Sequence, residues 1–198
     1  MNNWLEPTQL EGKQVTLIPL TKEHCDDLLK VAKDGNLWEL WYTGVPSEES
    51  IDNYIQNALQ QQQDGTSLPY VIQQNSTGKI VGCSRYCNVI TSSRRVEIGY
   101  TWYAKSVQRT AINTEAKLLL LTHAFETLNC IAVEFRTHWH NHPSRNAILR
   151  LGAKQDGVLR NHQQDADGAY RDTVVFSIIN SEWPTVKKSL ESKLTKSR

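Results

Sequence analysis

The spacing of apolar residues changes from a strand period to a helix period between residues 96 and 128. Val96, Ile98, Tyr100 and Trp102 alternate with polar or small residues, and this period of two predicts a strand. A polar run, KSVQRTAIN, then predicts a loop, and Asn113 at its end is the predicted N-cap of a helix. One apolar stripe of that helix is predicted to contain Leu118, Leu121, Phe125 and Leu128, with Leu120 and Ala124 beside it.

The same reading gives the other elements of the chain. Alternating or continuous apolar runs predict strands over 14–20, 67–74, 79–90, 130–140, 154–160 and 170–180. Helical spacing predicts helices over 23–34, 51–63, 144–151 and from 183 onward. Residues 161–169 are predicted to be an exposed loop, and residues 1–12 an N-terminal arm. Together these elements predict one mixed α/β sheet with helices on both faces.

Composition excludes several classes of protein. The 198 residues fit a single domain, predicted to span 1–198, and 22 basic against 21 acidic residues give no basic surface for nucleic acid. The chain has no apolar run long enough for a membrane span and no leader-like start, which predicts a cytoplasmic protein. Its cysteines lack metal-site spacing and are predicted to be reduced structural thiols: Cys25, Cys83, Cys87 and Cys130.

The strand–loop–helix unit is a candidate anion site. The first amides of a helix have no partner within the helix, and the helix dipole favours negative charge there. Gln108 and Arg109, just before the predicted helix, could add side-chain donors. These observations fit a phosphate or pyrophosphate site, and they fit an ordinary strand-to-helix turn as well.

Three sequence features together resemble the GCN5-related N-acetyltransferases (the GNAT superfamily). The loop of that family, Gln/Arg-x-x-Gly-x-Gly/Ala, corresponds here to residues 108–113, with Ala111 and Asn113 at the two glycine positions. Residues 141–145, Asn-His-Pro-Ser-Arg, followed by Leu-Gly-Ala at 151–153, resemble the RimJ/RimL-like branch. With Glu-Ile-Gly-Tyr at 97–100, the resemblance covers about residues 10 to 180.

The resemblance implies an acyl-CoA N-acyltransferase with a mostly antiparallel sheet and acetyl-CoA as co-substrate. The end of the central strand would pair with pantetheine, and the loop and first helical turn would bind the pyrophosphate. Asn141 would bind the pantetheine arm as well. The expected coenzyme-binding residues are Tyr100, Thr101, Trp102, Tyr103, Gln108, Arg109, Thr110, Ala111, Ile112, Asn113, Thr114, Asn141 and Ser144. Glu115 is expected to point away from the phosphate.

The resemblance also implies catalytic roles. Ser144 occupies the serine position of the Asn-x-x-Ser pattern and is the candidate acid for the leaving thiolate, although capping of a helix N-terminus would also explain a serine there. Glu97 is the candidate base, against a structural ion pair with Arg94 or Arg95. His162 is an alternative base, because its ordinary pKa suits proton transfer near neutral pH.

The acceptor side is less constrained. Trp41 and Tyr42 either line an acceptor pocket or pack under a loop, and Arg171 is expected at the acceptor mouth or in a structural pair with Asp172. His138, His140 and His142 would face one way on an extended strand with about 7 Å between neighbours, so no metal is expected.

The predicted reaction is direct transfer of an acetyl group, in a ternary complex, to a primary amine on a small molecule or a protein N-terminus. A homodimer is one assembly that we consider, and neither nucleic acid nor membrane is expected as a partner. A CoA-binding module without catalysis and an acyltransferase that uses a longer acyl group, such as succinyl, stay open as alternatives.

Overall fold

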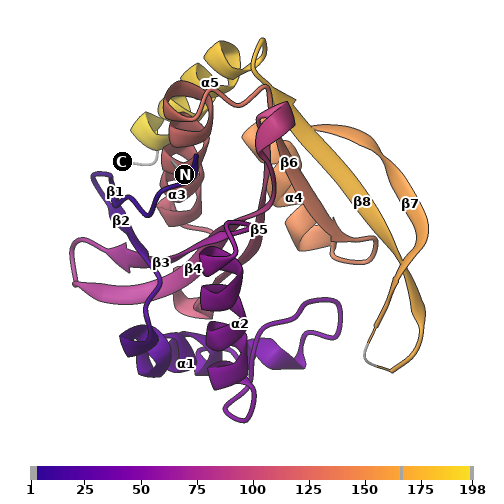
Figure 1. Ribbon diagram of the computed structural model, residues 1–198. Coiled ribbons are helices and arrows are strands. Elements are labelled where there is room, and N and C mark those ends of the chain that lie inside the picture. Colours follow the sequence, from indigo (N-terminus) through magenta and orange to yellow (C-terminus); the bar gives the residue numbers. More distant parts are fainter. Residues whose placement is uncertain (1–3, 166, 197–198) are drawn as a thin grey trace.

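The computed structural model describes residues 4–165 and 167–196 and contains one eight-stranded sheet in the order β1-β2-β3-β4-β5-β6-β8-β7 (Figure 1). The strands are β1 (Leu10–Glu11), β2 (Val15–Pro19), β3 (Leu68–Gln74), β4 (Lys79–Ile90), β5 (Arg95–Tyr103), β6 (Ala132–His138), β7 (Lys154–Gln164) and β8 (Tyr170–Ile179). The helices are α1 (Cys25–Lys33), α2 (Ile51–Gln63), α3 (Ile112–Thr122), α4 (His142–Leu151) and α5 (Trp183–Lys196). The mixed, mostly antiparallel sheet predicted from the sequence is confirmed.

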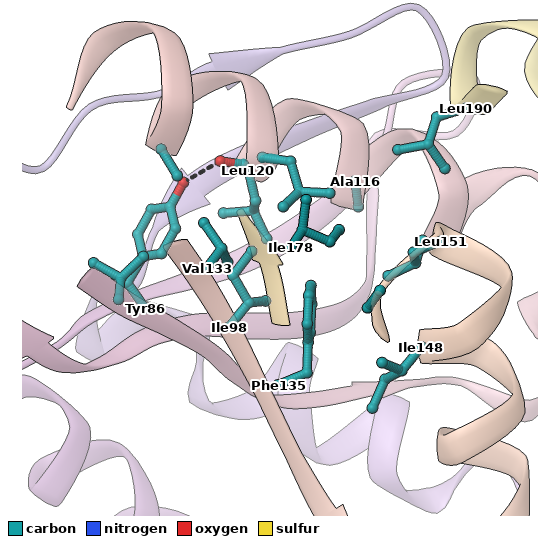
Figure 2. Packing of buried hydrophobic residues seen from close by; sticks show 14 of the residues in the cluster. Tyr86, Ile98, Ala116, Leu120, Val133, Phe135, Ile148, Leu151, Ile178 and Leu190 are labelled. Atoms are coloured by element: carbon teal, nitrogen blue, oxygen red, sulfur yellow. Dashed lines mark hydrogen bonds between the residues drawn. The ribbon is translucent and has the colours of Figure 1, made fainter. Parts of the chain in front are cut away.

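The helices cover both faces of this sheet. One hydrophobic cluster includes Ala116 of α3, Ile148 of α4 and Leu190 of α5, and it reaches strands from β2 to β8. Figure 2 shows these side chains in the same cluster as Ile98 and Phe135 of the central strands. A second cluster lies on the opposite face, under α1 and α2, and its buried residues all lie between Leu20 and Ala104.

Strands β5 and β6 form the parallel pair of the sheet, and this pair is short. Its register joins Arg95 to Ala132, Val96 to Val133 and Glu97 to Glu134, and it ends there. Beyond that point β5 continues beside β4, and β6 continues beside β8 as far as the pair His138 and Thr173. The sheet is therefore divided into two parts that separate after Glu97.

A β-bulge in β5 lies just beyond the separation. Cys83 pairs with Trp102 and Arg85 pairs with Gly99, so Ser84 of β4 lies opposite two residues of β5, Tyr100 and Thr101. Tyr100 has a φ of 50°, which is uncommon for a residue other than glycine, and its side chain is 51% exposed. The bulge therefore lies on the part of β5 that has no ladder with β6.

The long central helix starts and packs differently from the prediction. It begins at Ile112 with Ala111 as its N-cap residue, so Asn113 lies inside the first turn and is not the cap. Leu121, Phe125 and Leu128 are buried as predicted. Leu118 is only partly buried, and Lys117 lies inside instead. After Thr122 the helix continues as a π-helical turn, His123–Thr127.

Two other boundaries differ from the prediction. Strand β6 ends at His138, so His140 lies in the following turn and not on the strand. Strand β7 continues through Gln164, which places residues 161–164 of the predicted loop 161–169 on a strand that forms a hairpin with β8. The described part of the N-terminal arm contains the short strand β1, and residues 1–3 lie outside the described residues.

Two findings concern the composition-based expectations. All four cysteines are free, and Cys83, Cys87 and Cys130 are buried. Within residues 4–165 and 167–196, no helix is both long and apolar enough to cross a membrane.

Glu115 fixes the start of α3 to the edge of the sheet. Its carboxylate accepts hydrogen bonds from the amides of Lys13, Gln14 and Val15 at 3.2, 2.6 and 2.8 Å, and the residue is 6% exposed. The carboxylate therefore serves the turn between β1 and β2, as expected from the prediction that it points away from the phosphate loop. This anchor sets the position of the helix N-terminus relative to β2.

Replacement of Glu115 by Ala is expected to lower the free energy of unfolding by about 3 kcal/mol, because buried donors would lose a charged acceptor. Equilibrium urea denaturation measures this change. Glu115→Gln keeps one acceptor oxygen and should lose about half as much. A change below about 0.5 kcal/mol in the alanine variant would show that the three amides find other partners.

Candidate active site

The edge of β5 that faces β6 is the first part of the site. After the pair of Glu97 and Glu134, this edge has no ladder with β6, so the backbone of residues 98–103 can pair with another extended chain there. The predicted pantetheine-binding residues, Tyr100 to Tyr103, all lie on this stretch. The unpaired edge is what an extended amide-containing arm needs, and in this respect the structure fits pantetheine.

The loop between β5 and α3 is the second part. It contains a short 3₁₀ turn, Lys105–Val107, and Arg109 with a φ of 63°. The side chain of Gln108 donates to the carbonyl of Tyr103 at 3.0 Å, and Thr110 Oγ1 donates to Val107 at 2.7 Å. Gln108 therefore stabilises the loop from within through one of its amide hydrogens.

The N-terminus of α3 supplies backbone donors to this loop. The amide of Glu115 donates to the carbonyl of Ala111 at 3.0 Å, so the amides of residues 112–114 precede the helical ladder. The amide of Ile112 donates only a long hydrogen bond, of 3.4 Å, to Thr110 Oγ1. The predicted pyrophosphate-binding residues are thus brought together at a helix N-terminus, where an anion is stabilised.

The residues at the two glycine positions of the family loop have ordinary backbone conformations. Ala111 has φ and ψ of −71° and −13°, and Asn113 lies within the helix. Neither position requires a positive φ. The non-glycine residues are therefore compatible with this loop, and the left-handed residue is Arg109, which the sequence analysis had not singled out for its backbone.

The start of α4 holds the candidate acid. Asn141 caps this helix, and its Oδ1 accepts a hydrogen bond from the amide of Ser144 at 3.0 Å. The cap is therefore Asn141, and the hydroxyl of Ser144 is not used for capping. Helix α4 directly follows β6, so Ser144 lies on the β6 side of the separation between β5 and β6.

Glu97 is buried at the last pair of the parallel ladder, with 7% of its surface exposed. Its Oε2 accepts a hydrogen bond from Asn88 Nδ2 at 2.7 Å and lies 3.5 Å from Nε of Arg136. Arg95 pairs instead with Glu134, so the alternative ion pair predicted for Glu97 is not formed. Both partners of Glu97 come from strands that flank β5, and spacing along the chain could not have identified them.

The carboxylate of Glu97 extends along β5 toward the bulge. A Cβ atom placed on Gly99 would lie 3.1 Å from Glu97 Oε1, so the glycine leaves room for the carboxylate beside the backbone that leads to Tyr100. Burial raises the pKa of Glu97, and the hydrogen bond from Asn88 and the charge of Arg136 oppose this shift only in part. A buried carboxyl with a raised pKa is a suitable proton acceptor for an ammonium group.

A second polar group, which we call the His138 cluster, lies at the far end of β6. His138 is 4% exposed, its Nδ1 accepts from the amide of His140 at 3.0 Å, and its Nε2 lies 3.4 Å from Asp165. Burial lowers the pKa of His138, which favours the neutral imidazole. The hydrogen bond that Nδ1 accepts leaves the hydrogen of this neutral form on Nε2. The cluster consists of Trp41, His138, His162, Asp165, Arg171 and Thr173.

The cluster brings together residues predicted separately. The ring of Trp41 packs edge-on against His138 at 5.2 Å and is 65% exposed, which places this loop residue over the end of β6. Tyr42 packs on Trp41 at 5.5 Å. Nδ1 of His162 lies 3.1 Å from the hydroxyl of Thr173, the strand partner of His138.

Arg171 completes the cluster from β8. Its guanidinium lies 3.7 Å from Asp165 and donates to Gln163, whereas Asp172 pairs with Arg160 at 2.6 Å. The predicted pair of Arg171 with Asp172 is therefore wrong, because adjacent strand residues point to opposite faces. The histidine spacing indicated His138 only as a candidate metal ligand, and no local pattern indicates its central position in this cluster.

Potential metal ligands are the next feature of this region. Within the described residues, no group of three or more His, Cys, Asp or Glu side chains could hold a metal ion. His138 and His140 have ring centroids 5.6 Å apart, and both nitrogens of His138 already have partners.

Comparison with known proteins agrees with this architecture. Residues 14–154 match the model of the acetyltransferase (GNAT) domain, and the chain therefore belongs to the GNAT N-acetyltransferase family. It is 32% identical over 106 residues to the Bacillus subtilis protein named "Putative ribosomal N-acetyltransferase YdaF", a match that covers 54% of this chain and 57% of that relative's own length.

Two solved structures have the same fold. A GCN5-related N-acetyltransferase from Brucella melitensis is 26% identical, with a TM-score of 0.84 over 95% of this chain and 86% of that one. RimJ from Mycobacterium smegmatis, solved in complex with CoA-disulfide, is 23% identical, with a TM-score of 0.79 over 94% of this chain and 95% of that one.

The raised pKa of Glu97 predicts a stability effect with a defined sign. The folded state binds a proton more tightly than the unfolded state, so wild-type stability should fall as pH rises from about 4.5 through the folded-state pKa. Glu97→Gln removes this dependence and keeps an acceptor for Asn88. The variant should melt several degrees higher than wild type near pH 7, and the difference should vanish near pH 4.

Thermal unfolding followed by circular dichroism at several pH values measures this difference. Glu134→Gln serves as a control, because hydrogen bonds from Arg95 and Arg136 leave the pKa of Glu134 lowered and not raised. A lower melting temperature for Glu97→Gln at every pH would mean that the charge of Glu97 stabilises the fold.

Proposed function

We propose that this protein transfers an acetyl group from acetyl-CoA to a primary amine, by direct transfer in a ternary complex. The observation that carries the proposal is the separation of β5 from β6 after Glu97, next to the N-terminus of α3. The unpaired strand edge suits the amides of pantetheine, and the helix amides suit a pyrophosphate. Membership of the GNAT family supports the same assignment.

Residues 100–103 and 108–114, with Asn141, would hold the coenzyme. The amides of the bulge at Tyr100 and Thr101 would polarise the carbonyl of the thioester. Holding both substrates in line is the largest contribution, because it makes a bimolecular encounter local.

Glu97 would take the proton from the acceptor ammonium, which leaves a neutral amine with a free lone pair. The amine nitrogen then forms a bond to the carbonyl carbon, and the carbon–sulfur bond breaks. Ser144 would give its proton to the departing thiolate and take in return the second proton that the nitrogen loses as the amide forms, while Glu97 returns the first proton to solvent. Glu97 is preferred to His162 as the base because its carboxylate lies beside Gly99 at the bulge, whereas His162 lies on the hairpin of β7 and β8.

The His138 cluster would contact the acceptor. Trp41 offers an exposed aromatic surface. Tyr42 packs against Trp41, and Arg171 lies beside Asp165 of the cluster. The similarity to a relative named as a ribosomal N-acetyltransferase supports a protein N-terminus as one acceptor class, and a small primary amine is the other. We place the reaction in the cytoplasm, within a single acyl-CoA N-acyltransferase domain over residues 1–198.

Acetyl-CoA at saturating concentration should raise the melting temperature by several degrees, because a ligand held at 100 times its dissociation constant stabilises the folded state by about 2.7 kcal/mol. The same protein should release free thiol in the presence of an amine or peptide acceptor, measured with a thiol reagent. Stabilisation without thiol release across a broad acceptor panel would indicate a CoA-binding module. Faster release from succinyl-CoA would indicate a longer acyl donor.

Two substitutions should separate the proposed proton transfers. Ser144→Ala should lower kcat by about tenfold or more and leave the dissociation constant of acetyl-CoA nearly unchanged. Glu97→Gln should lower kcat/KM by about 100-fold and remove the rise in rate that follows deprotonation of the base. Wild-type kinetics in either variant would remove that residue from the mechanism, and His162→Gln would then test the alternative base.

A further inference from the structure

A buried lysine lies directly behind the bulge of β5. Nζ of Lys117 in α3 lies 2.6 Å from Thr101 Oγ1 and 3.0 Å from Ser84 Oγ, and the two hydroxyls are 2.8 Å apart. Lys117 is 5% exposed and Ser84 is 1% exposed. The three polar groups form a closed triangle inside the interface between α3 and the sheet.

The triangle joins the parts of the fold that create the bulge. Ser84 lies on β4 opposite Tyr100 and Thr101, where the register of β4 and β5 shifts. Thr101 Oγ1 also lies 3.3 Å from the carbonyl of Gly99, so the same hydroxyl contacts both sides of the bulge. The amine therefore connects α3 to the backbone segment whose other edge, beyond Glu97, has no ladder with β6.

The packing of the core does not explain this lysine. An aliphatic side chain of similar length would fill the space without a buried amine, and a buried polar group costs free energy unless it is well paired. Within the described part of the chain, no carboxylate lies at ion-pair distance from Nζ. Cys83 and Cys87 of β4 are the ionisable groups that interact electrostatically with the amine of Lys117. Burial raises the pKa of both thiols, that of Cys83 to about 12.

The surroundings of the amine favour its neutral form. Burial lowers the pKa of Lys117 to about 7. A neutral amine can donate to one hydroxyl and accept from the other, which completes the hydrogen bonds of the triangle without a counterion.

We propose that Lys117 is a positioning residue for acetyl transfer, which holds the bulge at Tyr100 and Thr101 through the hydroxyls of Ser84 and Thr101. The inference rests on the proposed function, because the bulge amides are the groups that would polarise the acyl carbonyl. Lys117 itself touches neither substrate. A loosened bulge would misalign the carbonyl and leave the pyrophosphate contacts, which come from the loop and helix amides, in place.

Lys117→Met tests this role, because methionine has a similar length and no polar head. We expect kcat to fall about tenfold or more, since small misplacements at a reacting centre are costly, and the dissociation constant of acetyl-CoA to change by less than about twofold. Leu121→Met, one turn further along α3 in the same core, is the matched packing control and should keep wild-type kcat. A kcat within about twofold of wild type for Lys117→Met, or an equal loss in Leu121→Met, would overturn the proposal.

A second readout follows the protonation of the amine without any turnover. The unfolded chain binds a proton on Lys117 up to about pH 10.5, whereas the folded chain releases it above about pH 7, so wild-type stability should rise across this window. Lys117→Met should therefore melt higher than wild type at pH 7, and the difference should shrink toward pH 10. A difference that does not change with pH would show that the buried amine is paired in another way.

Ser84→Ala is the independent variant, because it removes one hydroxyl and leaves the amine in place. Ser84→Ala should also lower kcat. The double variant with Lys117→Met should lose no more activity than the worse single variant, since both substitutions act through one network. Additive losses would overturn the proposal. Absence of thiol release by wild-type protein would instead refute the proposed function, and the melting experiment would still report on the buried amine.

Discussion

The parallel pairing of β5 with β6 lasts for three residue pairs, and the position at which it stops determines the rest of the site. On one side of the stop, β5 stays with β4, and on the other side β6 stays with β8. The two parts of the sheet are held together by the core around α3, which contains side chains from β2 through β8 and from α5. The core under α1 and α2 contains buried residues only from Leu20 to Ala104 and does not bridge the two parts. The strands can therefore separate toward the α1 and α2 face and remain joined on the α3 face.

Three buried ionisable groups lie along this separation. Glu97 and His138 lie on strands that border the separation, and Lys117 lies behind the bulge of β5. Burial shifts the pKa of each group toward its neutral form, upward for Glu97 and downward for His138 and Lys117. Such groups reduce stability in an ordinary core, and perturbed pKa values concentrate at functional sites. These three groups therefore lie close to one feature of the sheet, the point at which β5 and β6 separate.

The local pattern of the sequence predicted the elements well and their partners poorly. The predicted ranges 51–63 and 79–90 coincide with α2 and β4, because turn residues and a clear apolar period bound each of them. The N-cap of α3 lies two residues before the predicted Asn113, since the backbone of Ala111 forms the cap without a side-chain acceptor. Lys117 is buried in place of the predicted Leu118 because hydroxyls from β4 and β5 bind its amine. The helical period of the sequence cannot reveal such partners. The same reason applies to Glu97, whose partners Asn88 and Arg136 come from neighbouring strands.

The loop between β5 and α3 forms without glycine at either glycine position of the family motif. Glycine is required where φ is positive or where a side chain would block the backbone, and only the second reason applies to Ala111 and Asn113 in this conformation. The left-handed residue is Arg109, at a φ of 63°, and for a residue other than glycine this conformation costs roughly 1 kcal/mol. Hydrogen bonds from the side chains of Gln108 and Thr110 to the backbone on the N-terminal side of the loop offset that cost. The side-chain volume of Ala111 and Asn113 is therefore the remaining difference from a glycine loop. This volume does not prevent the loop from forming, but it would limit how closely a phosphate can approach the amides.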